Sequence, residues 1–384
     1  MDKSDFVELQ SKTINFLRFP MAIAVVFIHT HADVGNLVDA DFKFFSWQGI
    51  YNVVGVLFSH VLSHIAVPLF FFISGLLFFI NFREWSWLRY RKKIKSRIYT
   101  LIIPYILWNL IPFLLFLLGY MVIGVKNHSL EEIKNFLYST NINLFYDYHS
   151  WETVTNWFGK KVVMSGPFNF PLWFLRDLIF VSVLTPLIYY LINKLKVIFI
   201  ILLLFAYLSN VWISIPGLSV LACFFYSLGA YISINLINVF AILKKYRKIV
   251  LTTSLILLFV SVVYDGMNTI IGSFFYPFFI IFMSSCVFYF AFLFVYKSHL
   301  MVGNTLISSC FFIYVFHCMP LPLFGNLNHL IRVFLLKIMP GQSPVDMVIV
   351  YFANPLFTVA ICVFLFRILT MFLPRVSGVF MGNR

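Results

Sequence analysis

Two ionisable residues, Arg18 and His29, lie inside the first long apolar stretch of this 384-residue chain. They are eleven positions apart, which on an α-helix means a rotation of about 20° past three full turns and a rise of about 16 Å. Both side chains therefore face the same way, with a guanidinium toward one end of the helix and an imidazole toward the other. Ionisable groups inside such stretches are costly and are functional candidates by default. The pair predicts a groove for a long ligand with a phosphate tail and a reactive head. In the alternative interpretation, Arg18 reaches lipid headgroups and His29 hydrogen-bonds within the helix bundle.

The composition requires these residues to lie in a membrane protein. Hydrophobic residues make up 61% of the chain and charged residues 11%, whereas a soluble chain is roughly 45–50% apolar and about 25% charged. This excludes a soluble enzyme, a disordered protein and a nucleic-acid-binding domain. The net charge of +14 is concentrated in short runs between apolar stretches, which indicates membrane topology. The five cysteines lie in apolar stretches without a CxxC pair, so they indicate packing residues.

The apolar stretches predict about ten membrane-spanning helices, since each approaches the roughly 20 residues that a span needs. They cover about 14–31, 56–80, 98–123, 171–192, 197–213, 218–238, 249–264, 270–296, 305–325 and 346–372. The first of them is expected to be an uncleaved span rather than a signal peptide.

The basic residues predict the topology of this bundle. The runs at 83–97 and 239–248 are expected to be cytoplasmic loops, because Lys and Arg accumulate on the inner side. An even number of spans then places both termini in the cytoplasm. The sequence predicts an all-α integral membrane protein with a single domain, 1–384. Its long outer loop at 124–170 contains a segment, 151–163, that suits an interfacial helix.

Five segments along the chain carry a family pattern: INFLRFPMAIAVVFIHTH, VPLFFFISGLLFF, SRIYTLIIPYILW, PLWFLRDL and SSCFFIYVFH. In order and spacing they resemble motifs of the acyltransferase-3 family of bacterial membrane O-acyltransferases, the type that O-acetylates surface polysaccharides. The first segment matches its Arg-X10-His signature with Arg18 and His29, and the second its FFxxSG motif. The chain departs from the family's Arg-x-x-Arg pattern, because Arg97 matches the first arginine while position 100 is Thr. Lys93, one turn earlier, is the candidate substitute.

The resemblance implies transfer of an acyl group, usually acetyl, from cytoplasmic acyl-CoA to a hydroxyl of a cell-surface or lipid-linked carbohydrate. It also implies a bacterial cell membrane as the location. Arg18, Arg97 and Lys93 would bind the phosphates of acyl-CoA, which acts as a co-substrate, and no tightly bound cofactor is expected. His29 would take the hydroxyl proton as a general base. It could instead accept the acyl group covalently, and the sequence leaves both routes open.

Four more residues are candidates for binding the acceptor or supporting the site. His317 belongs to the last family segment, and Trp173 offers a stacking surface for a sugar. Asp177 follows Arg176 directly, so a local ion pair is the alternative role for both. Ser74 is the fourth candidate, although small residues at such positions also permit close packing of membrane helices.

Histidines gather toward the outer side of the predicted bundle. His60 and His64 are one turn apart, and with His29, His31 and His317 they could approach a metal-ligand set. The sequence offers no carboxylate-rich or HExxH context for such a site. We therefore predict no metal, and expect hydrogen-bonding or acceptor-binding roles instead.

Two other function classes also fit ten spans with buried polar residues. One is a transporter or flippase for a lipid-linked sugar or similar solute, but such proteins usually show internal repeats, and none is visible here. The other is a non-catalytic membrane subunit of a polysaccharide machine, for which loss of His29 would be harmless. The common face of Arg18 and His29 and the basic run at 83–97 favour an enzyme.

Overall fold

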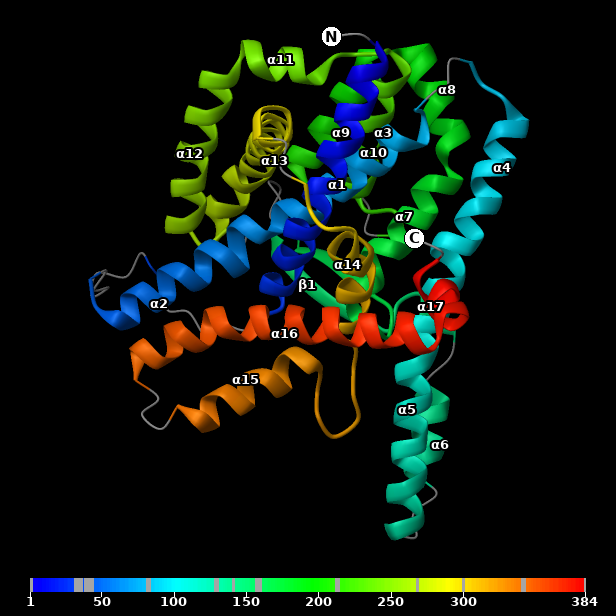
Figure 1. The fold of residues 1–384 in the computed structure, drawn as a ribbon, viewed down its shortest axis with the longest axis vertical. Helices are drawn as coiled ribbons and strands as arrows, with labels where there is room; N and C mark the ends of the chain where they lie inside the picture. The colour runs from blue at the N-terminus through cyan, green and yellow to red at the C-terminus, as the bar shows by residue number, and fades with distance from the viewer. Residues whose placement is uncertain are drawn as a thin grey trace.

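The computed structural model of the chain describes residues 3–30, 37, 45–80, 84–127, 131–139, 142–155, 161–210, 215–266, 269–298, 301–339 and 343–382. This described part is helical almost throughout, with one two-stranded antiparallel sheet (Figure 1). The predicted helical class is confirmed.

The first half of the chain contains six α-helices and the sheet, all within the described residues. In order they are α1 (Lys3–Ile28), α2 (Trp47–Gly55), a π-helical turn η1 (Val56–Val61), η2 (Leu62–Ile65), α3 (Ala66–Phe78), α4 (Trp87–Arg97), η3 (Ile98–Ile102), α5 (Ile103–Asn127), α6 (Glu131–Ser139), η4 (Ile142–Phe145), β1 (His149–Thr155) and β2 (Lys161–Gly166).

The second half is helical wherever it has regular structure. It comprises η5 (Phe170–Leu172), α7 (Trp173–Val183), α8 (Thr185–Leu195), α9 (Val197–Ser209), α10 (Val220–Ile234), α11 (Val239–Lys245), α12 (Arg247–Val263), α13 (Ile270–Ser298), α14 (Asn304–Phe316), α15 (Leu327–Ile338), α16 (Pro344–Phe372) and α17 (Pro374–Met381).

Several of these helices are long and apolar enough to cross a bilayer. Among the described residues the structure has five such segments: Glu8–Ile28, Trp47–Phe78, Trp87–Val122, Ile270–Ser298 and Pro344–Phe372. Two bent pairs, α7 with α8 (60°) and α10 with α11 (103°), raise the number to seven if each pair is one span. The protein is therefore a multi-pass membrane protein. The predicted total of ten and the cytoplasmic termini stay predictions.

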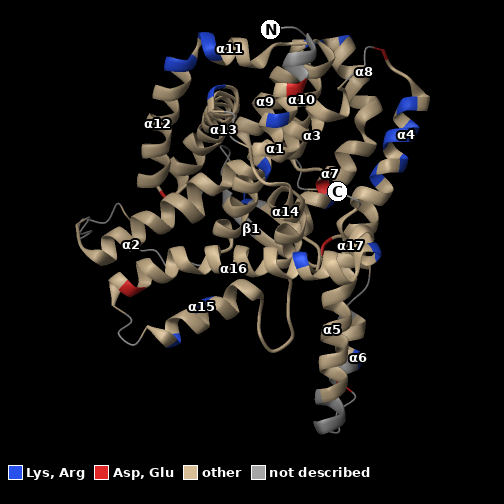
Figure 2. Ribbon diagram, in the orientation of Figure 1, with Lys and Arg blue, Asp and Glu red and all other residues tan. Residues whose placement is uncertain are grey.

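The two basic runs differ from the loops that the sequence led us to expect. Residues Trp87–Arg97 are helical, because Ser86 accepts a hydrogen bond from the backbone N–H of Arg89 and caps α4, and Lys and Arg favour helices. Residues Val239–Lys245 form α11, capped in the same way by Asn238. These parts of the predicted loops are therefore helical, and their cytoplasmic side stays a prediction. Figure 2 shows that the basic residues of α4 and α11 lie in the half of the molecule that holds the N-terminus.

The outer segment 151–163 is also different from its prediction. Instead of an interfacial helix it belongs to a β-hairpin, in which Ser150 pairs with Ser165 and Trp151 with Met164. Alternating Thr, Val and Trp side chains favour extended strands over a helix. Residues 156–160 of this segment lie outside the described residues.

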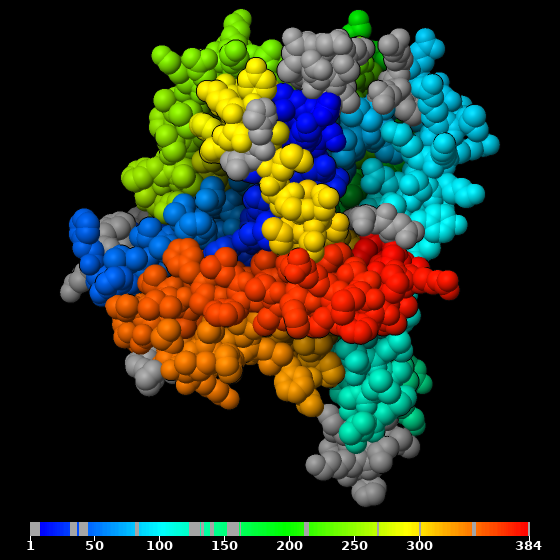
Figure 3. Space-filling view, viewed as in Figure 1, coloured from blue at the N-terminus to red at the C-terminus, as the bar shows by residue number. Residues whose placement is uncertain are grey.

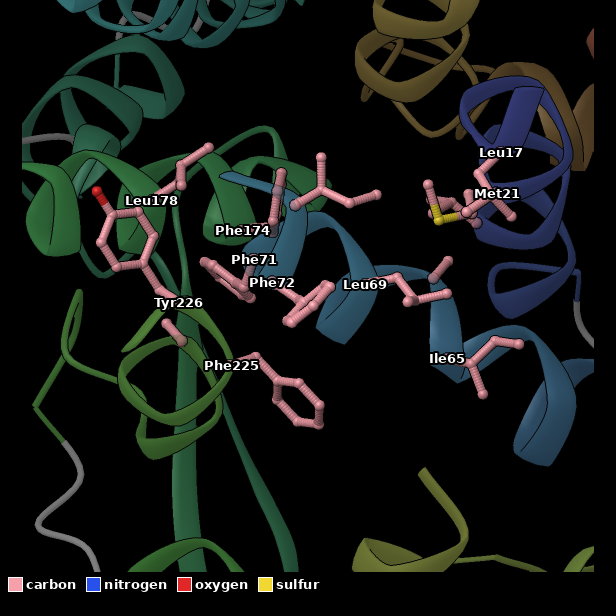
Figure 4. Packing of buried hydrophobic residues seen from close by; sticks show 14 of the residues in the cluster. Leu17, Met21, Ile65, Leu69, Phe71, Phe72, Phe174, Leu178, Phe225 and Tyr226 are labelled. Carbon is pink, nitrogen blue, oxygen red and sulfur yellow. The ribbon is translucent and has the colours of Figure 1, made fainter. Parts of the chain in front are cut away.

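The core is built where α3 crosses α10. Gly75 of α3 lies against the backbone of Tyr226, and Gly229 of α10 lies against the backbone of Phe72. Small residues let membrane helices approach closely enough for continuous van der Waals contact. Figure 4 shows aromatic side chains of α3 and α10 packed beside Phe174 of α7, with Leu17 and Met21 of α1 approaching from the other side.

The C-terminal end of α1 lies among segments that are far away in the sequence. Helix α1 packs against α13, α14 and α16, and also contacts η1 and η2. In Figure 3, α16 runs across the visible face. Just above α16 in this view, α14 lies beside α1. This crossing positions the histidine that follows α1.

Candidate functional site

His29 directly follows the last residue of α1, where the helix tightens. Its backbone N–H donates to the carbonyl of Val26 (3.2 Å), and the N–H of Thr30 donates to that of Phe27 (3.1 Å). The last carbonyls of a helix have no partner within the helix. The carbonyl of Phe27, which already accepts from Thr30, also accepts from the hydroxyl of Ser59 in η1 (2.8 Å). The helix end that carries His29 is thus tied to a second segment.

Asn328 of α15 joins the two histidines of the site. Its side-chain amide donates to the carbonyl of His29 (2.9 Å), and its backbone N–H donates to the carbonyl of His317 (3.2 Å). Thr358 of α16 donates to the remaining amide oxygen (3.4 Å). Asn328 is 2% exposed, so these bonds are sheltered from competing solvent.

The imidazoles of His29 and His317 lie side by side, with ring centres 5.2 Å apart and planes inclined by 48°. His317 is fully buried at the end of α14. Its Nδ1 lies 2.9 Å from the carbonyl of Ile313, and since a carbonyl only accepts, Nδ1 carries the proton. The other nitrogen, Nε2, is then an acceptor, and it has no hydrogen-bond partner among the described residues.

His29 lines a cavity of about 480 Å³. The cavity wall is mostly apolar and aromatic, with Trp151 of the hairpin and Trp173 of α7 among its residues. Indole rings are broad, amphipathic surfaces, and a cavity with a few convergent polar groups is the usual form of a small-molecule site. Of the predicted candidates, His29, Trp173 and Asp177 line this cavity together.

A second histidine of the wall is paired with a carboxylate. The Nδ1 of His60, in η1, lies 2.6 Å from Oδ1 of Asp265. Asp265 has the left-handed backbone angle φ of 50°, and Gly266 after it has φ of 55°, which allows this turn to approach η1 closely. The sequence analysis missed this pair, because 205 positions separate its members. His64 also lines the cavity.

Metal binding has no matching ligand cluster in the part of the chain that the structure describes. No group of three or more His, Cys, Asp or Glu side chains there is arranged to hold an ion. His31, which the sequence analysis included in the metal alternative, lies outside the described residues.

Arg176 and Asp177 form a buried ion pair in the cavity wall. The guanidinium is bonded to Oδ1 of Asp177 through Nε and Nη2, both at 3.0 Å. It also donates to the hydroxyl and carbonyl of Ser165 in β2, each at 3.0 Å. Asp177 accepts further hydrogen bonds from Ser219, the cap residue of α10. The pair therefore fastens the hairpin to α7 and α10.

Two arginines predicted to bind the donor have no fixed partner. Arg18 is half-buried on α1 within electrostatic range of Cys310 of α14, and Arg97, at the end of α4, is within electrostatic range of Tyr226 of α10. Neither side chain has a hydrogen bond or ion pair within the described residues. The two arginines therefore have different neighbours, on α14 and on α10 respectively. Neither arginine lines the cavity that holds His29.

Lys93 differs from these arginines, because its ammonium group is hydrogen-bonded to other parts of the protein. It donates to the carbonyls of Leu77 and Phe78 at the end of α3, and it lies 5.0 Å from the ring centre of Phe78. A cation at this place satisfies carbonyls that the helix leaves free and complements the helix dipole. The structure thus places Lys93 as a C-terminal cap of α3.

Ser74 lies on α3 next to Gly75, at the close contact with α10, and does not line the cavity. Its surroundings match the packing role that the sequence analysis left as the alternative.

Comparison with known families identifies most of the chain as one unit. A family model described as an acyltransferase domain matches residues 11–371. The match includes every residue of the site, from Arg18 to Thr358. No curated protein and no solved structure gives a significant match to the chain.

Proposed function

Because the chain belongs to the acyltransferase-3 family, we propose that this membrane acyltransferase moves an acetyl group from acyl-CoA to a carbohydrate hydroxyl. The observation that carries the proposal is the position of His29. Its imidazole lines an aromatic cavity, and Ser59 and Asn328 hold the backbone around it. An imidazole is the side chain best suited to taking a hydroxyl proton near neutral pH.

The proposed reaction uses His29 as a general base. A nitrogen of its ring takes the proton from the acceptor hydroxyl while the hydroxyl oxygen attacks the thioester carbonyl carbon. The new C–O bond forms and the C–S bond breaks. The CoA thiolate leaves and receives the proton back from the His29 imidazolium. In the alternative route, His29 itself carries the acetyl group before the hydroxyl attacks.

The donor is proposed to bind through its phosphates near Arg18, in the interior of α1. Arg18 and Arg97 suit this role, because neither has a protein partner among the described residues and guanidinium groups bind phosphate in a bidentate manner. The rise of about 16 Å between Arg18 and His29 leaves room for the pantetheine arm along α1. Acyl-CoA is then a co-substrate, and the proposal requires no tightly bound cofactor. Lys93 contributes indirectly, by capping the helix that packs beside Arg97.

The acceptor is proposed to be a cell-surface or lipid-linked glycan that enters the cavity. Trp151 and Trp173 offer two indole surfaces in its wall, and sugar rings bind to aromatic faces through their C–H groups. Asp177 and Arg176 are used for fastening the hairpin, so their part in acceptor binding is to hold Trp151 in place.

The proposed setting is the plasma membrane of a bacterium, with ten spans and both termini in the cytoplasm. The basic helices α4 and α11 support this orientation through the positive-inside rule. Arg97 would then be near cytoplasmic acyl-CoA. Family membership does not favour the transporter interpretation.

The test compares membranes that contain wild-type protein with membranes that contain His29→Ala. Radiolabelled acetyl-CoA is supplied, and the envelope glycan is extracted and counted. We expect label on the glycan with wild type, and loss of that label with His29→Ala at equal protein level. His329→Ala is the matched control, since His329 is an exposed histidine of α15.

Glycan labelling that survives His29→Ala would refute the proposed role of His29. Wild-type protein that labels no glycan would refute acetyl as the transferred group. A brief incubation with labelled acetyl-CoA alone separates the two routes, because only the covalent route leaves label on the protein, and that label must depend on His29.

A further inference from the structure

A buried acceptor atom beside His29 has no partner, and the proposed function does not yet use it. Nε2 of His317 is enclosed by protein, and no hydrogen-bond donor meets it among the described residues. Such atoms are rare in folded proteins and call for an explanation. Leaving a buried acceptor without a donor is unfavourable, so an apolar residue would be the simpler choice here.

The local structure fixes which nitrogen of His317 is the acceptor. Nδ1 donates its proton to the carbonyl of Ile313 (2.9 Å). That carbonyl already accepts the backbone N–H of His317 (3.1 Å), so it does not need a second donor for its own sake. The effect of the side-chain bond is to hold the imidazole in one tautomer, with the lone pair on Nε2.

The ring next to this lone pair is His29. The centres of the two imidazoles are 5.2 Å apart, which brings a nitrogen of one ring within hydrogen-bond reach of a nitrogen of the other after a small rotation. Asn328 holds the two backbone segments together, because it donates to the carbonyl oxygens of both histidines. The distance between the rings is therefore set by the fold.

We propose that His317 is a positioning residue whose Nε2 accepts the N–H of His29, so that the opposite, unprotonated nitrogen of His29 faces the acceptor hydroxyl and takes its proton. This inference rests on the proposed function. Before proton transfer, neutral His29 has one N–H. This N–H is directed to Nε2 of His317, and after transfer the imidazolium has a second N–H, which faces the departing CoA thiolate. When the thiolate takes its proton, His29 returns to the neutral form, and no proton is gained or lost by His317.

The arrangement favours catalysis because the bond becomes stronger as positive charge develops on His29. An acceptor whose hydrogen bond is stronger near the transition state than in the ground state lowers the barrier without tightening substrate binding to the same extent. His317 thereby does for His29 what a carboxylate does for the histidine of a catalytic triad. A neutral imidazole does so without placing a negative charge inside the bundle, where charge is costly.

The test uses His317→Leu, which removes both nitrogens, and His317→Gln, which can place an amide oxygen near the position of Nε2. Acetyl transfer from labelled acetyl-CoA to extracted envelope glycan is measured with full-length protein in membranes. For His317→Leu we expect kcat to fall by about 10- to 100-fold, with the KM for acetyl-CoA unchanged. His317→Gln should recover a substantial part of the lost kcat. His329→Leu, on the exposed face of α15, should match wild type.

Thermal unfolding separates this role from a structural one. Since Nε2 has no hydrogen-bond partner among the described residues, His317→Leu should unfold at or above the temperature of wild type. A parallel loss of stability and activity would overturn the inference in favour of a packing role. An unchanged kcat in His317→Leu, or no recovery in a stable His317→Gln, would overturn it too. Wild type and His29→Ala are assayed alongside, so failure of the proposed function appears in those proteins and failure of this inference only in the His317 variants.

Discussion

Replacing Gly75 by alanine tests the close crossing of α3 and α10 directly. A Cβ atom at Gly75 would lie 2.0 Å from the carbonyl oxygen of Tyr226, 2.8 Å from its carbonyl carbon and 3.1 Å from the backbone nitrogen of Ala230. Ordinary contacts of a Cβ atom begin near 3.4 Å, so the oxygen must move by about 1.4 Å, the difference from 2.0 Å. Because the obstructing atoms are backbone, a rotamer change cannot relieve the clash, and the helices must separate.

The separation affects the whole contact. On the opposite side of the crossing, Gly229 already lies as close to Phe72, where a Cβ atom would be 2.1 Å from the carbonyl oxygen. Overpacking usually costs about 1–3 kcal/mol, and we expect Gly75→Ala to reach about 3 kcal/mol, since the main chain has to shift. The effect should extend to Lys93, which caps the last turn of α3.

The assay is thermal unfolding of purified protein in detergent, followed by size-exclusion chromatography. Gly75→Ala should lose several degrees of apparent Tm and a large share of its monodisperse peak. Gly303→Ala is the matched control, because a Cβ atom there meets no other atom within 4 Å. As Gly303 is the N-terminal cap residue of α14, its replacement costs at most about 1 kcal/mol. A Gly75→Ala protein as stable as Gly303→Ala would refute the close crossing.

Three further predictions concern the site and the hairpin of β1 and β2. Asn328→Ala leaves the carbonyl of His29 without its donor; we expect about 1–3 kcal/mol lower stability and slower acetyl transfer at unchanged KM for acetyl-CoA, and wild-type kinetics would contradict the positioning role. Arg176→Met leaves the buried Asp177 carboxylate without its cation, so we expect about 3–5 kcal/mol of destabilisation, seen as lost monodisperse protein, and a normal yield would contradict the pair's role. Burial lowers the pKa of His149, against the opposing effect of its bond to a backbone carbonyl. Unfolded protein then binds the proton more readily, so stability should be full above about pH 6.5 and decline below it. His149→Gln should flatten this acid limb in Tm measured from pH 5 to 8, and an unchanged limb would count against the assignment.

Helix geometry was sufficient to predict the features that depend on local spacing. The long apolar stretches all contain helices in the structure. The common face of Arg18 and His29 stays a prediction, because α1 ends at Ile28 and Arg18 does not line the cavity that holds His29. The close packing beside Ser74 was available as an alternative, because small residues mark membrane-helix contacts. The catalytic and binding roles of these residues stay predictions.

The remaining features depend on contacts between distant parts of the chain, which spacing does not reveal. Asn328 and His29 are 299 positions apart in the sequence. The residues around Asn328 in the sequence do not indicate this contact. Asp265 meets His60 only because a turn with two left-handed residues approaches η1. Lys93 looks like a donor ligand by distance from Arg97, yet in three dimensions the end of α3 supplies carbonyls to its ammonium group. In each case tertiary packing decides which partner a polar group finds.

The adjacency of Arg176 and Asp177 has a consequence for biogenesis. Each charge alone would hinder partition of α7 into the bilayer by about 2.5–3.5 kcal/mol on insertion scales. Because the guanidinium reaches the neighbouring carboxylate within the same helix, the two charges can leave the translocon as a net-neutral unit. The bonds to Ser165 then form only when the hairpin packs against the helix. The cavity wall is therefore complete only once the hairpin, which contributes Trp151 and Ser165 to it, has packed against α7.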